Sequence, residues 1–187
     1  MVTVFSFSIL SIAFIVQLTS LKKRFSVKRG TRLLFFITVG FILAYFVYLI
    51  VFQYILWRDA GQPSIYFIPP YQSIWYVVNY HFIRFGLYYL ISLAAAAAFF
   101  VAAQKLNKRF NERFFEPEEP YLGALSIFLL GNPAWGYAWI FYIMAMLSVA
   151  AIATSYQLLV TKKNHRFSLY WLWLPVAILT IIVMSLF

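Results

Sequence analysis

Long apolar runs fill most of this 187-residue chain and limit what it can fold into. A helix needs about 20 predominantly apolar residues to cross the hydrocarbon core of a bilayer, and several such windows follow one another along the sequence. Hydrophobic residues make up 64% of the chain and charged residues only 11%, whereas soluble domains are apolar over about half of their residues. The sequence therefore predicts an all-α integral membrane protein in which residues 1–187 form a single polytopic domain in the lipid bilayer.

Six membrane-spanning helices are predicted, of which the fourth is short. Their expected ranges are 2–21, 33–57, 85–103, 120–131, 134–160 and 167–187. A kink is expected in the last helix at Pro175, and the mixed aromatic and polar segment 71–84 predicts one further helix at the membrane interface. The turn signal Gly-Asn-Pro at residues 131–133 ends the fourth helix. Because this helix is too short to span comfortably, we expect it to be buried against its neighbours.

Basic residues cluster in three of the predicted loops. Six of the 15 lysines and arginines lie in residues 22–32, four in 105–113 and three in 162–166. The positive-inside rule makes these alternate loops cytoplasmic, so we expect the chain in the cytoplasmic membrane with both termini outside. Since this topology accounts for the net charge of +10, no nucleic acid is expected as a partner. The sequence has no cysteine and predicts neither a metal site nor a cofactor.

Three of the five acidic residues, Glu116, Glu118 and Glu119, lie together just before the fourth predicted helix. One interpretation is local. Pro120 is a natural first residue of a helix, Glu119 would then be its cap, and carboxylates are favourable at the positive end of the helix dipole. The basic residues of segment 105–113 are close enough in sequence to pair with these glutamates.

A second interpretation starts from the segment EPEEPYLGALSIFLLGNP, residues 116–133. It resembles a motif of the type IV prepilin peptidases, intramembrane aspartyl proteases in which Gly-x-Gly-Asp precedes an apolar run of the Lys-Leu-Gly-Ala-Leu kind that ends in Gly-x-Pro. The match places Glu119 at the aspartate position. Segment 162–178, KKNHRFSLYWLWLPVAI, is similar to the last basic loop and span of that family. In SLKKR, at the end of the first predicted span, Ser20 stands where the family has its other aspartate.

Both catalytic positions depart from the family pattern, and its two glycines are Glu116 and Glu118 here. Aspartyl proteolysis needs two carboxyls that share a proton, and a serine at position 20 does not titrate near neutral pH. Glu118 and Glu119 would need an irregular backbone to act as the pair, since adjacent helical residues point about 100° apart. His165, in another cytoplasmic loop, is the nearest base that Ser20 would need to become a nucleophile.

The resemblance thus implies a catalytic set of Glu119, Glu118 and Ser20 with doubtful activity. The resulting hypothesis is a prepilin-peptidase-like protein that has lost or weakened proteolysis and binds a membrane partner or a pilin-like segment. Three alternatives remain: an active prepilin peptidase that uses Glu119, a small transporter or binding component that uses the aromatic patch at residues 132–142, and a structural subunit of a membrane complex. A carrier should have a polar cavity near mid-membrane, and a subunit should have a large, flat contact surface.

Overall fold

The computed structural model describes residues 2–20, 27–110, 115–156 and 168–186, and every regular element in these ranges is helical, as predicted. The longer helices are α1 (Val2–Ser20), α2 (Val27–Asp59), α3 (Ile74–His81), α4 (Leu87–Arg109), α5 (Glu119–Leu129), α6 (Ala138–Tyr156) and α7 (Trp173–Met184). Three short helical turns complete the description: Ser64–Phe67, Phe82–Gly86 and Pro133–Trp135.

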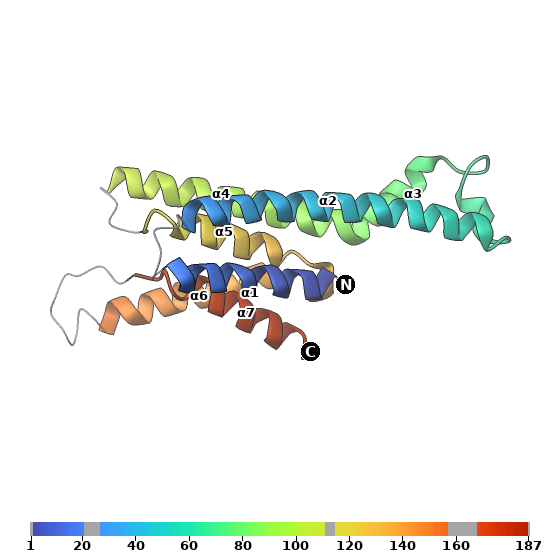
Figure 1. The fold of residues 1–187 in the computed structure, drawn as a ribbon. Helices are drawn as coiled ribbons and strands as arrows, with labels where there is room; N and C mark the ends of the chain where they lie inside the picture. Colours follow the sequence, from blue (N-terminus) through green and yellow to red (C-terminus); the bar gives the residue numbers. More distant parts are fainter. Residues whose placement is uncertain (1, 21–26, 111–114, 157–167, 187) are drawn as a thin grey trace.

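The long helices run side by side in one elongated bundle (Figure 1). α5 lies at its centre and contacts α1, α2, α4, α6 and α7, with the most extensive contact made to α4. Both chain termini lie toward the same end of the bundle, and α2 begins at the opposite end, where α4 and α6 finish (Figure 1). This arrangement brings α5, which is far from α1 in sequence, against it in space.

Helix α5 is the short fourth helix that the sequence predicts, and ten of its eleven residues are buried. Glycines permit this burial. A Cβ added to Gly123 would lie 2.5 Å from the Phe99 ring, and one added to Gly131 would lie 2.0 Å from Ser92 Oγ. The predicted Gly-Asn-Pro turn is also confirmed, because α5 ends at Leu129 and the chain turns directly afterwards.

Within the described ranges, three helical segments are long and apolar enough to cross a membrane: Arg29–Asp59, Ile74–Arg109 and Ala138–Tyr156. Two shorter apolar helices, Val2–Leu18 and Trp173–Met184, accompany them. Large apolar side chains face outward from these helices; Leu43 is 60% exposed and Ile152 is 70% exposed. Soluble monomers rarely show extended apolar surface of this kind, so the chain has the character of a helical membrane protein. The count of six spans stays a prediction.

The predicted boundary between an interfacial helix and a third span is not a break in the structure. Instead, α3 continues through a π-helical turn at Phe82–Gly86 into α4, which gives one helical segment from Ile74 to Arg109. A π turn accommodates an extra residue while the backbone stays hydrogen-bonded, so no loop is needed where the sequence changes from mixed to apolar.

Two further boundaries differ from the sequence-based expectation. Pro175 does not kink the last helix, because α7 begins at Trp173 and places the proline in its first turn, where a missing N–H leaves no helical hydrogen bond unmade. α6 begins at Ala138 rather than at residue 134. Asn132 Oδ1 accepts a hydrogen bond from the backbone N–H of Ala134 at 3.1 Å, and Gly136 then adopts a φ of 58°, a left-handed conformation that interrupts a helix.

The connection from α2 to α3 carries an aromatic cluster around Trp57. Its ring centroid lies 5.4 Å from that of Phe67, 6.0 Å from that of Tyr76 and 5.4 Å from that of Tyr80. Arg84 donates a hydrogen bond to the Tyr80 hydroxyl at 2.6 Å and extends the cluster toward α4. Amphipathic aromatic rings of this kind are enriched at membrane surfaces.

Candidate functional site

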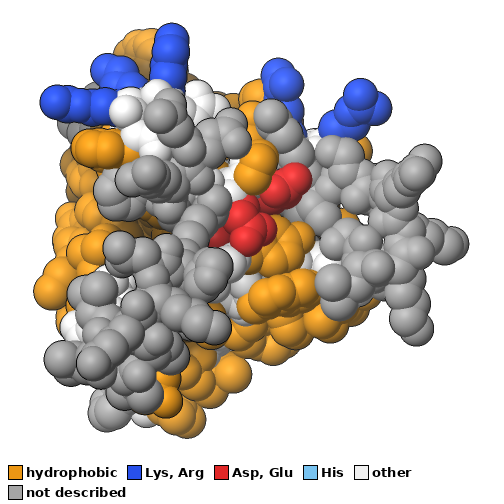
Figure 2. Space-filling view, turned by 90° about the vertical axis from the view of Figure 1, so that its left-hand side faces the viewer, with side chains coloured by type: hydrophobic (Ala, Val, Ile, Leu, Met, Phe, Trp, Pro, Cys, Tyr) orange, Lys and Arg blue, Asp and Glu red, His pale blue; other side chains and the backbone are white. Residues whose placement is uncertain are grey.

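The glutamate cluster lies at the end of the bundle where α2 begins and α4 ends. Viewed from that end, acidic side chains lie near the middle and lysines and arginines lie toward one margin (Figure 2). The described basic residues there are Arg29, Arg32, Lys105, Lys108 and Arg109. The described parts of the first two basic segments, 22–32 and 105–113, therefore lie at the same end of the bundle as the glutamates.

Asn107 places the acidic segment beside the end of α4. Its side-chain Nδ2 donates to the carbonyl oxygen of Phe115 at 2.7 Å, and its Oδ1 accepts from the Phe115 backbone N–H at 2.8 Å. The Phe115 ring also packs edge-on against Phe99 at 6.1 Å between ring centroids. This double hydrogen bond holds the returning chain so that α5 starts next to α4. Asn107 was not predicted from the sequence.

Glu119 is the first residue of α5 and is only 1% exposed. Its Oε1 accepts a hydrogen bond from Ser168 Oγ at 3.3 Å, across 49 residues of sequence. The expectation that Glu119 caps a helix beginning at Pro120 is wrong by one residue, because Glu118 occupies the capping position. Glu119 faces inward and joins α5 to the segment before α7.

Glu116 and Glu118 are partly exposed, unlike Glu119. The Glu118 side chain makes no capping hydrogen bond. Within the described ranges, neither glutamate forms the expected ion pair with the basic residues at the end of α4; Arg113 lies outside these ranges. Ion pairs between exposed side chains contribute little, about 0–1 kcal/mol, so sequence proximity alone does not hold them together.

Gln17 is a buried polar residue that the sequence analysis missed. It lies on the inward face of α1 with Leu10 and Ala13 and is 0% exposed. Its Nε2 donates to the backbone carbonyl of Tyr170 at 2.6 Å, and the backbone N–H of Tyr170 donates to Ser168 Oγ at 3.3 Å. Gln17 and Glu119 therefore both form hydrogen bonds with the short segment 168–170, which precedes α7. A lone amide inside an apolar helix is the signal that could have revealed it, since polar side chains are costly in membranes.

The predicted catalytic set is only partly described. Ser20 is the last residue of α1, but its side chain and the whole of His165 lie outside the described residues. Glu118 and Glu119 occupy different environments, one partly exposed and one buried, so this arrangement does not favour a shared proton. Among the described residues, no three His, Asp or Glu side chains group closely enough to hold a metal ion.

Two cavities lie on the face of α5 that points away from Glu119. The first has a volume of about 330 Å³ and includes Tyr121 and Ala124 in its lining. The second has a volume of about 150 Å³, includes Phe128, and is lined almost entirely by apolar side chains. Neither resembles the polar mid-membrane cavity expected of a carrier.

The helices and their outward apolar side chains define the class of this chain as an all-helical protein with segments able to cross a membrane. Comparison of the chain with protein-family models, curated proteins and solved structures finds no match. The resemblance to the prepilin peptidases accordingly stays a prediction from the sequence.

Proposed function

We propose that this chain is a six-helix protein of the cytoplasmic membrane, built like the prepilin peptidase core, that binds a membrane partner and does not cleave it. The partner would be a pilin-like segment or another apolar helix. The observation that carries this proposal is the state of Glu119, which is 1% exposed and accepts a hydrogen bond from Ser168. A carboxyl group this buried has little contact with water or with a substrate, which favours a structural role over a catalytic one.

The chemistry of aspartyl proteolysis supports the same conclusion. One carboxylate must be ionised to activate water while a second, protonated carboxyl polarises the scissile carbonyl. Here Glu118 is partly exposed while Glu119 is buried, and the described polar residue nearest the end of α1 on its inward face is the neutral amide of Gln17. An amide cannot replace the second carboxyl, because it does not titrate.

We expect a tagged type IV prepilin to remain uncut when it is co-expressed with this chain, and to be retained when the chain is purified in mild detergent. The reason is that binding through apolar helix surfaces does not require a carboxyl pair. Cleavage is measured by the mobility of the tagged prepilin, with an active prepilin peptidase as the positive control. Cleavage by this chain that is lost in Glu119→Ala would contradict the proposal, and so would the absence of both cleavage and retention.

The proposed orientation can be tested by labelling because the sequence has no cysteine. We expect a cysteine introduced at Ser64, between α2 and α3, to react with a membrane-impermeant maleimide in intact cells. A cysteine introduced at Lys108, near the end of α4, should react only after the membrane is permeabilised, because the positive-inside rule makes that end cytoplasmic. The reverse pattern would overturn the orientation and move the glutamates to the outer surface.

A further inference from the structure

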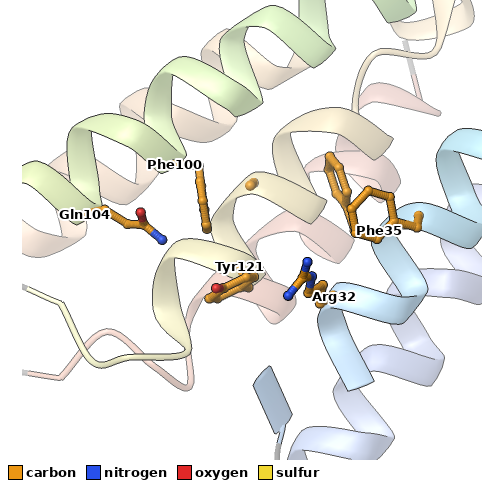
Figure 3. A pocket seen from close by; sticks show the side chains of 7 residues that line it. Arg32, Phe35, Phe100, Gln104 and Tyr121 are labelled. Atoms are coloured by element: carbon orange, nitrogen blue, oxygen red, sulfur yellow. The ribbon is translucent and has the colours of Figure 1, made fainter. Parts of the chain in front are cut away.

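We propose that the face between α2 and α4 binds one anionic phospholipid, with its phosphate at the basic end of the bundle. The site is the cavity of about 330 Å³ whose side walls are α2 and α4 and whose floor is α5 (Figure 3). Its volume falls within the range of about 300–1,000 Å³ that is typical of ligand pockets. Its lining residues are Arg32, Phe35, Phe36, Phe100, Gln104, Tyr121 and Ala124.

The polar groups of this cavity can recognise a phosphate. Arg32 from α2 and Gln104 from α4 lie on either side of Tyr121 (Figure 3). Arg32 and Gln104 offer guanidinium and amide donors, and arginine binds phosphate with strong charge-assisted hydrogen bonds. Within the described parts of the chain, no carboxylate pairs with Arg32, whose guanidinium carbon lies 5.8 Å from the centre of the Phe36 ring. Its charge is therefore available to a headgroup.

The apolar groups of the same cavity continue away from the charged end. Phe35, Phe36 and Phe100 line it next to the polar side chains. The second cavity, of about 150 Å³, is lined by further turns of the same three helices, from Val39 on α2 onward. This order, with phosphate donors in the first cavity and apolar side chains in the second, matches the chemistry of a phospholipid. Basic pockets between membrane helices are known to take lipid headgroups of this kind.

The stretch of α2 that lines the two cavities is also long enough for a lipid chain. The two cavities are lined along α2 from Arg32 to Phe46, and fourteen residues of helix rise by about 21 Å. Half of a hydrocarbon core about 30 Å thick is about 15 Å, so an acyl chain that begins at the basic end can follow α2 through its own leaflet.

An apolar helical segment is a poorer match for this cavity, because it carries no anion for Arg32 and Gln104, whereas a phospholipid carries both a phosphate and an apolar chain.

Native mass spectrometry of the full chain in mild detergent tests the proposal, with phosphatidylglycerol and phosphatidylcholine added separately. We expect phosphatidylglycerol to be retained preferentially as a one-to-one complex. Arg32→Gln should weaken this binding by about 10- to 100-fold, the effect of losing one charge-assisted hydrogen bond. Arg58→Gln is the matched control, because Arg58 lies near the other end of α2 and pairs with Asp59 at 2.8 Å; it should leave binding unchanged.

A second variant tests the cavity itself. Ala124→Phe should fill the space and exclude the lipid, whereas Ala102→Phe, which replaces an exposed alanine on α4, should not. If Ala124→Phe fails to fold, the exposed Arg32→Gln variant still decides the question. Equal retention of the two lipids, no effect of Arg32→Gln, displacement of the lipid by inorganic phosphate alone, or displacement by the tagged prepilin would each overturn the proposal.

Discussion

Gly131→Ala should destabilise the protein by about 1–3 kcal/mol, the usual cost of forcing extra atoms into a packed interior. The added Cβ would lie 2.0 Å from Ser92 Oγ and 2.5 Å from Ser92 Cβ. Ser92 cannot simply turn away, because its single hydroxyl hydrogen is shared between the carbonyl oxygens of Tyr89 and Phe128, which lie 3.1 and 3.3 Å from Oγ. The clash therefore pushes α4 away from the turn that ends α5, and these two helices form the most extensive contact in the bundle. The measurement is thermal unfolding of the purified protein in detergent.

Two controls make this result specific. Gly40→Ala introduces the same methyl group on α2, where nothing lies within 4 Å of it, and it should leave stability unchanged or raise it slightly, since alanine favours helix more than glycine does. In a Ser92→Gly background the two closest atoms are gone and only the Phe128 carbonyl oxygen, at 3.1 Å, remains near the added Cβ, so Gly131→Ala should cost clearly less than in the natural chain. Equal cost in the two backgrounds would show that this contact does not determine the packing.

Glu119→Ala should lower stability by about 1–3 kcal/mol, the range for removing one partner of a buried hydrogen bond and leaving the other unsatisfied. The substitution removes the acceptor for Ser168 and the link between α5 and the segment that leads into α7. Glu119→Gln keeps an oxygen that can accept this bond and should lie between the natural chain and Glu119→Ala. Unfolding temperatures of the three proteins in the same detergent provide the comparison.

Glu118→Ala is the matched control for Glu119, because it removes the adjacent glutamate, whose side chain makes no capping hydrogen bond. Its effect should stay within about 0.5 kcal/mol, as for ordinary surface positions. If both alanine variants were as stable as the natural chain, the structural role assigned to Glu119 would be wrong.

Composition and local pattern predict the helical class and the short buried helix. The run from Leu122 to Leu130 is apolar and ends at Gly131, so its length alone separates it from a membrane-spanning helix. The predicted helix boundaries were less accurate where one residue is compatible with two backbone structures. Pro175 is compatible with either a kink or a helix start, and the position of Trp173 at the start of α7 decides for the latter.

The candidate site was also predicted only in part. The sequence draws attention to Glu119, because charged residues are scarce beside apolar segments. Its environment depends on partners that are distant in sequence: Ser168 lies 49 residues away, and the hydrogen bond from Gln17 reaches Tyr170 across 153 residues. A single sequence contains no local pattern that pairs such positions, so neither contact was predicted.

The length of α2 has a consequence for how the protein sits in a membrane. Its 33 residues extend for about 50 Å, against a hydrocarbon core of about 30 Å. Even at a steep tilt of about 40°, α2 would cover roughly 38 Å along the membrane normal. One end of α2 must therefore extend beyond the acyl chains. The aromatic cluster around Trp57 is suited to hold the carboxyl-terminal end of α2 among the lipid headgroups, which would set the depth of the bundle in the membrane.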